Sequence, residues 1–213
     1  MRKNGMTVVD LFSGCGGFSE GFHLAGFDIR CAIDHWDAAR KSIAMNHGED
    51  VIPKSADRYN YEIDTISKLP NKEFNDIIPD TDIIIGSPPC ISFSNSNRSG
   101  YADKTLGIRL IEAFMRIVAR KKNQPNSKLK YWIMENVPNA EKFIENEYIF
   151  RPGTNNEYKG QRKNLTLKNV KGTNSKVYNM AEYGVPSKRF RYICGDFLAP
   201  SRSFKYNDVR DVP

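Results

Sequence analysis

The stretch TVVDLFSGCGG, residues 7–17, decides the fold class of this chain. Residues 7–12 form a short, mostly apolar run, which is typical of a strand buried inside a sheet. The glycines that follow, Gly14, Gly16 and Gly17, let backbone N–H groups at the start of a helix approach a ligand closely. A strand, a glycine loop and a helix in this order bind many kinds of nucleotide. The stretch therefore predicts an α/β fold but is weakly specific for its ligand.

The alternation of strand and helix continues through the first 150 residues. The sequence predicts further strands at 29–33, 82–86, 131–134 and 190–194, and helices at 19–25, 36–46 and 106–121. Near-continuous apolar strands between amphipathic helices indicate a mostly parallel sheet with helices on both faces.

Residues 151–176 break this alternation, because they are polar, rich in Asn, Lys and Gly, and without a clear period. We therefore expect three parts. A cofactor-binding and catalytic α/β core occupies 1–150, and a polar basic loop or insertion occupies 151–176. The final strands of the core occupy 177–213, together with the start of a link to a further domain.

Composition narrows the class of protein. The chain has 213 residues, 39% of them hydrophobic and 27% charged, as in ordinary globular domains. It has neither an apolar run near the roughly 20 residues of a membrane span nor the apolar stretch of a signal peptide, so we expect a cytoplasmic protein. Its four cysteines are widely spaced and it has only three histidines, which predicts reduced thiols and no metal site.

Positive charge is concentrated in the last third of the chain. Residues 1–150 hold 19 Lys and Arg against 20 Asp and Glu, a net charge of −1, whereas residues 151–213 hold 13 against 5, a net charge of +8. Scattered charge usually means a solvated face, but such a surface also attracts the phosphates of nucleic acid. Charge alone does not decide between the two.

The ends of three predicted strands carry residues suited to chemistry. Asp34 follows the second strand, where an acidic residue often binds ribose hydroxyls, and Trp36 is placed to stack on a purine. Cys90 follows Pro88 and Pro89, whose stiffness argues for an exposed nucleophile rather than an inert buried thiol. Glu135 follows the strand at 131–134, so a nucleophile and a carboxylate can meet over one substrate.

Two arginines near the C-terminus, Arg189 and Arg191, alternate on one face of the predicted last strand. They form either a solvent-exposed edge or a pair that faces phosphate or a flipped base.

Four motifs in order resemble those of the DNA cytosine-5 methyltransferases. They are DLFSGCGGF at 10–18, GSPPCISFS at 86–94, ENV at 135–137 and YGVPSKRFR at 183–191. The resemblance covers nearly the whole chain and is weakest over 151–176. It implies a Rossmann-like fold of the S-adenosylmethionine-dependent methyltransferases. Its function would be methyl transfer from S-adenosylmethionine to C5 of cytosine in double-stranded DNA, in a restriction-modification setting.

The resemblance also implies a role for individual residues. The catalytic group comprises Cys90, Glu135, Arg189 and Arg191, with Cys90 forming a covalent adduct. The cofactor would be held by Phe12, Gly14, Gly16, Gly17, Asp34, Trp36, Asp64, Pro89 and Leu110. His35 is the alternative ribose ligand to Asp34, and Glu62 the alternative adenine ligand to Asp64.

The chain departs from the family in two ways. Ser187 stands where the late arginine motif usually opens with Gln. Nothing in the 213 residues resembles the target-recognition domain or the last two motifs. We therefore expect a split or truncated enzyme that needs a second polypeptide. A rival interpretation is a non-catalytic DNA-binding or regulatory module. An RNA-directed relative is a third, which the PPCISFS run (88–94) does not favour.

Overall fold

A computed structural model describes residues 3–89, 104–151 and 163–202 of the chain. Its helices and strands, in chain order, are β1 (Thr7–Leu11), α1 (Gly17–Leu24), β2 (Asp28–Ile33), α2 (Asp37–His47), α3 (Ile63–Ser67), α4 (Asn71–Ile77), β3 (Ile83–Gly86), α5 (Lys104–Asn123), β4 (Tyr131–Asn136), β5 (Glu147–Phe150), β6 (Leu165–Lys168), β7 (Lys176–Asn179) and β8 (Phe190–Asp196). Short 3-10 turns lie at Glu49–Val51, Lys54–Tyr59, Pro138–Phe143 and Met180–Tyr183.

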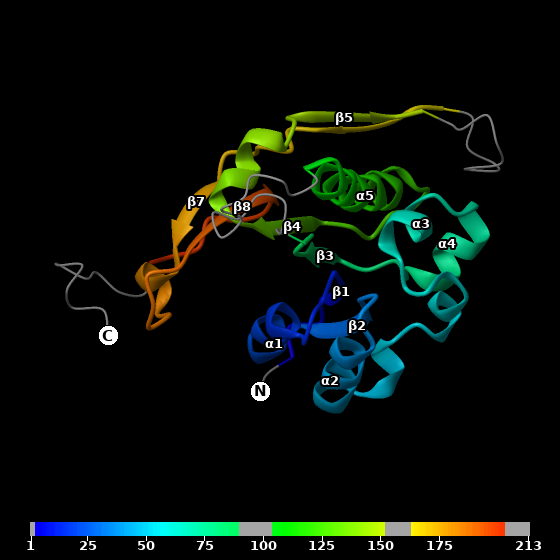
Figure 1. Ribbon diagram of the computed structural model, residues 1–213, viewed down its shortest axis with the longest axis horizontal. Helices are drawn as coiled ribbons and strands as arrows, with labels where there is room; N and C mark the ends of the chain where they lie inside the picture. Colours follow the sequence, from blue (N-terminus) through cyan, green and yellow to red (C-terminus); the bar gives the residue numbers. More distant parts are fainter. Residues whose placement is uncertain (1–2, 90–103, 152–162, 203–213) are drawn as a thin grey trace.

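The main sheet has the strand order β2-β1-β3-β4-β8-β7 (Figure 1). The first four of these strands run parallel, while β8 pairs antiparallel with β4 and β7 pairs antiparallel with β8. Parallel neighbours need crossover helices, which explains why helices separate the first four strands along the chain. Because the carboxyl ends of β1, β2, β3 and β4 lie at one edge, the residues that follow these strands are brought together there.

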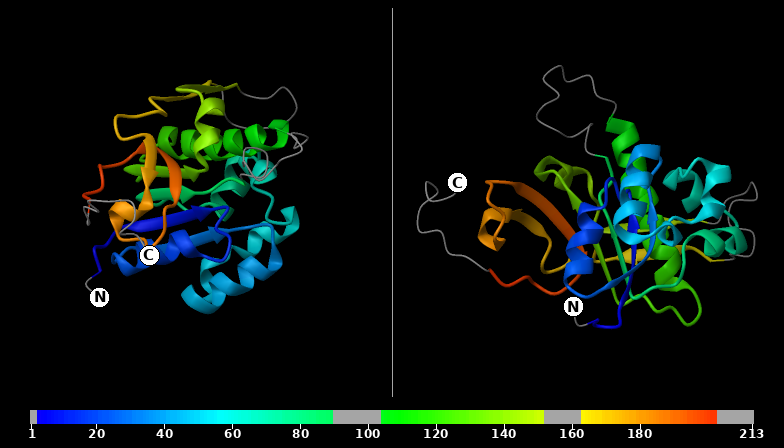
Figure 2. Two further views of the ribbon diagram at one scale, coloured as in Figure 1. Left: turned by 60° about the vertical axis from the view of Figure 1, so that its left-hand side comes forward. Right: turned by 90° about the horizontal axis from the view of Figure 1, so that it is seen from below.

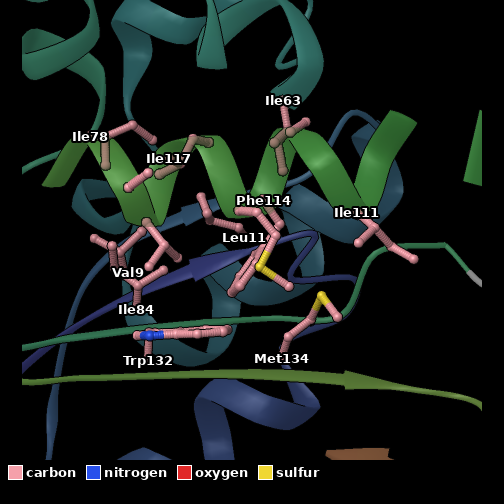
Figure 3. Packing of buried hydrophobic residues seen from close by; sticks show 14 of the residues in the cluster. Val9, Leu11, Ile63, Ile78, Ile84, Ile111, Phe114, Ile117, Trp132 and Met134 are labelled. Atoms are coloured by element: carbon pink, nitrogen blue, oxygen red, sulfur yellow. The ribbon is translucent and has the colours of Figure 1, made fainter. Parts of the chain in front are cut away.

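Helices cover both faces of the sheet, as the sequence predicts. In the two views of Figure 2, as in Figure 1, α5 lies on one face while α1 and α2 lie on the other. Ile111, Phe114 and Ile117 of α5 are fully buried against strand residues such as Leu11 and Trp132 (Figure 3). This packing fixes β3 and β4 relative to β1, and thereby fixes the edge that carries the candidate site.

Gly86, the last residue of β3, allows an unusually close approach. A Cβ atom at this position would lie 2.6 Å from the carbonyl oxygen of Leu11 and 2.7 Å from the Phe114 ring. Any larger residue would therefore push β3 away from β1 and α5 just before the chain turns into Ser87 and Pro88.

One segment differs from its sequence-based prediction. Residues 165–168, inside the stretch expected to be a loop, form β6, which pairs antiparallel with β5. Leu165 and Leu167 are buried and Thr166 is partly exposed, so the strand has one apolar face that packs with α5. The pattern was missed because only four residues show it between polar neighbours. The predicted division into domains remains a prediction.

Candidate active site

The described start of the loop after β3, residues 87–89, is anchored by two hydrogen bonds. The Ser87 N–H donates to the carbonyl oxygen of Leu11 at 3.2 Å, and the buried Asn136 Nδ2 donates to the carbonyl oxygen of Pro88 at 3.1 Å. The proline pair is thus tied to β1 and to the end of β4. Cys90, the predicted nucleophile, comes two residues after Pro88 and lies outside the described residues.

Glu135 is held by two side chains from two other segments. Ser87 Oγ donates to Glu135 Oε2 at 2.6 Å, and Arg191 Nε lies 2.7 Å from Glu135 Oε1. About a fifth of the side chain is exposed in both Glu135 and Arg191, at 22% and 21%. Both carboxylate oxygens are therefore fixed by short, charge-assisted bonds in a partly dry setting, where such bonds are strong.

The structure separates the two predicted arginines. Arg191 lies in β8, next to β4, and reaches Glu135. Arg189 precedes β8 in a tight turn, in which its backbone carbonyl accepts from the Met180 N–H at 2.9 Å, and the residue is exposed. Arg191 is therefore the arginine that contacts the carboxylate.

The glycine loop between β1 and α1 has left-handed backbone at several positions. Phe12, Gly14 and Gly16 have φ angles of 58°, 53° and 91°. A Cβ atom at Gly16 would lie 3.0 Å from Ile43, so this glycine also permits close helix packing. Gly14 and Gly17 have no atom within 4 Å of the position of a Cβ, which leaves open space beside the loop.

Asp34 braces this loop from the end of β2. Its Oδ2 accepts from the Gly14 N–H at 2.9 Å, and its Oδ1 accepts from the Trp36 N–H at 2.9 Å. The Asp34 side chain is only 12% exposed, whereas the neighbouring His35 side chain is 62% exposed with its Nδ1 3.6 Å from Asp34 Oδ1. Trp36 is 60% exposed, so it is not a core residue.

Asp64, in the first turn of α3, is surrounded by positive charge. Its carboxylate oxygens lie 3.0 Å from Lys68 Nζ, 3.4 Å from Arg109 Nε and 3.7 Å from Arg116 Nη1. Glu62, the alternative adenine ligand, precedes the helix and is exposed. Asp64 is thus engaged with α5, and Glu62 is the freer carboxylate.

The remaining predicted cofactor residues, Pro89 and Leu110, are both partly exposed. The structure therefore describes every predicted site residue except Cys90.

Sequence reasoning missed two residues of this edge. One is Ser87, whose contact with Glu135 depends on the register of β3 against β4. The other is Asp10, a buried carboxylate in β1 whose Oδ2 accepts from Ser19 Oγ at 2.7 Å while its Oδ1 has no hydrogen-bond partner among the residues that the structure describes. Burial raises the pKa of Asp10 to about 7. An acidic residue inside an apolar strand was the available signal for Asp10.

Two further findings concern the described part of the chain. It contains no helix that is both long and apolar enough to cross a membrane. It also contains no cluster of three or more His, Cys, Asp or Glu side chains that could hold a metal ion.

At one edge of a mostly parallel sheet, the structure brings together a glycine loop, the start of a proline-containing loop and a braced glutamate. The model of the C-5 cytosine-specific DNA methylase family matches residues 6–208. The chain belongs to this family, and the predicted fold is confirmed.

Individual relatives agree with this assignment. The type II methyltransferase M.HindV of Haemophilus influenzae is 31% identical over 222 residues, which cover 97% of this chain and 61% of the relative. The type II methyltransferase M1.HphI of Haemophilus parahaemolyticus is 31% identical, over 97% of this chain and 52% of the relative. The chain thus spans between half and two thirds of these relatives.

A solved structure shares the fold at lower sequence identity. The S. pombe Dnmt2 methyltransferase superposes with a TM-score of 0.51 and 21% identity, over 92% of this chain and 51% of that chain.

Proposed function

We propose that this chain transfers a methyl group to C5 of cytosine in double-stranded DNA, with Cys90 as the covalent nucleophile. The observation that carries this proposal is the Glu135 carboxylate, held by Ser87 and Arg191 at the strand edge where the Pro88-Pro89 loop leads to Cys90. A fixed carboxylate beside a nucleophile-bearing loop is the arrangement that activation of a pyrimidine ring requires.

The role of Cys90 follows from the weak nucleophilicity of cytosine C5. Addition of the Cys90 thiolate to C6 makes C5 electron-rich, so a covalent step replaces one difficult step with two easier ones. After C5 is methylated, loss of the C5 proton allows the Cys90 sulfur to leave.

Glu135 has the complementary role on the other side of the ring. Its carboxyl group is placed to accept from the exocyclic amine and to pass a proton to N3, which neutralises the negative charge that addition of the Cys90 thiolate puts on the ring. Arg191 keeps the carboxylate in position. Because C6 and C5 are inaccessible inside a duplex, the target base must leave the stack, and the strand edge must receive it.

The glycine loop and its surroundings fit S-adenosylmethionine, which supplies the methyl group when bound. Gly14 and Gly17 leave open space beside the loop, and the exposed Trp36 is available for stacking. Phe12, Gly16, Pro89 and Leu110 complete the set that we propose for cofactor binding.

The contacts of Asp34 and Asp64 favour their alternatives as ligands of the ribose and the adenine. Both Asp34 oxygens accept backbone N–H groups, so we assign Asp34 the task of shaping the loop and name His35 as the exposed candidate for the ribose. For the adenine we favour Glu62, because three cations already surround the Asp64 carboxylate.

The relatives are longer, since the chain spans 61% of M.HindV and 52% of M1.HphI. We propose that a target-recognition domain completes the enzyme, either as further sequence or as a second polypeptide. Alone, the chain should bind DNA weakly, without sequence preference and with strong salt dependence.

A methyl-transfer assay tests the proposal. The wild-type chain, with a recognition-domain partner added, should label cytosine-containing duplex DNA from radiolabelled S-adenosylmethionine. Cys90→Ser and Glu135→Gln should each abolish labelling, whereas Cys15→Ser, which changes an exposed cysteine, should not. DNA binding without any turnover in the completed wild-type enzyme would instead favour the non-catalytic alternative.

A further inference from the structure

We infer that a cavity binds the phosphate group of a ligand. The cavity lies at the side of the sheet where the parallel strands begin, opposite the candidate active site at their carboxyl ends. The cavity has a volume of about 500 Å³ and lies between α4, the end of α5 and residues 163–165. Since α5 crosses between the parallel strands β3 and β4, it starts near their carboxyl ends and finishes at the opposite edge. In Figure 1, α4 lies at the end of α5 that is remote from β7.

Two asparagine side chains in the cavity wall have fixed orientations. Arg120 Nη2 donates to Asn71 Oδ1 at 3.0 Å, and Lys121 Nζ donates to Asn75 Oδ1 at 2.9 Å. Guanidinium and ammonium groups only donate, so the amide oxygens must face these cations and the NH₂ groups must point elsewhere.

These NH₂ groups form a pair of free donors. Asn71 and Asn75 are four residues apart on α4 and therefore share one face of the helix. Within the described part of the chain, neither NH₂ group donates a hydrogen bond. Both residues line the cavity and are exposed, so the cavity presents two adjacent, solvent-facing donors with no acceptor among the described residues.

Positive charge surrounds this pair. Arg120 is only 4% exposed, and its guanidinium packs 3.7 Å from the centre of the Phe74 ring while also donating to the Ser67 carbonyl oxygen at 2.8 Å. Lys163 lies exposed in the cavity wall. Among the described residues that line the cavity there is no carboxylate.

The chemistry of the wall selects the ligand. Amide donors beside a held guanidinium and a lysine suit an anion with several acceptor oxygens, and the described residues of the wall include no carboxylate that would balance a cation. The cavity also falls in the range of roughly 300–1,000 Å³ that is usual for small-molecule sites, so it can hold more than one phosphate group. The phosphate can come from the DNA backbone or from a small phosphorylated molecule.

Binding of inorganic phosphate by the full chain tests this inference. Isothermal titration at constant ionic strength, with chloride as the reference anion, should show saturable phosphate binding to the wild type. The double variant Asn71→Asp, Asn75→Asp keeps the acceptors for Arg120 and Lys121 but replaces both donors with carboxylate oxygens. Its affinity for phosphate should fall at least tenfold.

Two further variants keep the test interpretable. Asn46→Asp makes the same kind of change at an exposed position on α2 and should leave phosphate affinity unaltered. Lys163→Glu reverses the charge of an exposed residue in the cavity wall and should weaken phosphate binding severalfold. Absence of saturable binding in the wild type, or equal binding in the double variant, would overturn the inference.

A last titration identifies the source of the phosphate. If a DNA duplex displaces bound phosphate in the wild type, the site serves the DNA backbone. If duplex and phosphate bind additively, the site serves a small phosphorylated ligand. Both results are compatible with phosphate binding in the cavity. Because none of these measurements uses methyl transfer, a negative result would not contradict the proposed function.

Discussion

The Ser87 hydroxyl donates a 2.6 Å hydrogen bond to the Glu135 carboxylate across the ends of β3 and β4. The two residues are 48 positions apart in the chain and come together because β3 and β4 are parallel neighbours, with Gly86 opposite Met134. Arg191 holds the second oxygen at 2.7 Å. The carboxylate is therefore oriented before any substrate arrives, which is how an enzyme avoids reorganisation during the reaction.

We expect Ser87→Ala to lower kcat more than it raises KM. Losing a hydrogen bond to a charged group costs about 1.5–3 kcal/mol, which corresponds to roughly a tenfold to hundredfold loss of rate. Methylation kinetics of the completed enzyme measure this change. Ser55→Ala, which removes an exposed hydroxyl that donates to a backbone carbonyl, is the matched control and should leave kcat unaltered. A Ser87→Ala enzyme with wild-type kcat would show that this contact does not position Glu135.

Asp34→Ala should weaken the binding of S-adenosylmethionine, because the Gly14 and Trp36 N–H groups lose their common acceptor. The expected loss is about 1–3 kcal/mol, measured by calorimetry. Asp37→Ala removes an exposed carboxylate nearby in the first turn of α2 and serves as the control. Unchanged affinity in Asp34→Ala would mean that the loop keeps its shape without this brace.

Asp10 should make folding stability depend on pH. Its pKa is raised by burial from 3.8 to about 7, so the folded chain binds a proton that the unfolded chain releases between these values. The contribution of Asp10 to the free energy of unfolding is therefore largest below about pH 4. It is lost as the pH rises to about 7, at up to roughly 1.4 kcal/mol per pH unit.

Asp10→Asn removes this dependence while retaining an acceptor for Ser19. The stability advantage of Asp10→Asn over wild type should grow from pH 5 to pH 7 and stay constant above it, as followed by urea denaturation. A constant difference between Asp10→Asn and wild type would contradict the raised pKa.

The sequence predicted those parts of the molecule that short-range patterns encode. The apolar run in β3 and the helical spacing in α5 predicted buried elements, and both are confirmed. Residues 165–168 were not predicted as a strand, because their alternation is short and gains meaning only from pairing with β5. A local pattern of apolar and polar residues does not predict which other segment a strand will pair with.

The candidate site shows the same limit. The order of the motifs predicted that Glu135 and Arg191 belong to one catalytic group. Their contact, however, depends on the antiparallel pairing of β4 and β8. The motif also grouped Arg189 with Arg191, although the turn before β8 leaves Arg189 exposed. Likewise, an acidic residue after β2 signalled a cofactor contact, while the bonds from Asp34 to the loop backbone required the three-dimensional structure.

In the proposed mechanism, Cys90 attacks C6 of the target cytosine. The most direct measurement is covalent trapping of the completed enzyme on duplex DNA that contains 5-fluorocytosine, with S-adenosylmethionine present and peptide mapping of the adduct. Fluorine replaces the C5 hydrogen and cannot leave as a cation, so the elimination that would release the Cys90 sulfur is blocked and the adduct should persist and map to Cys90. Trapping that survives Cys90→Ser, or an adduct at Cys15, Cys31 or Cys194, would contradict the account.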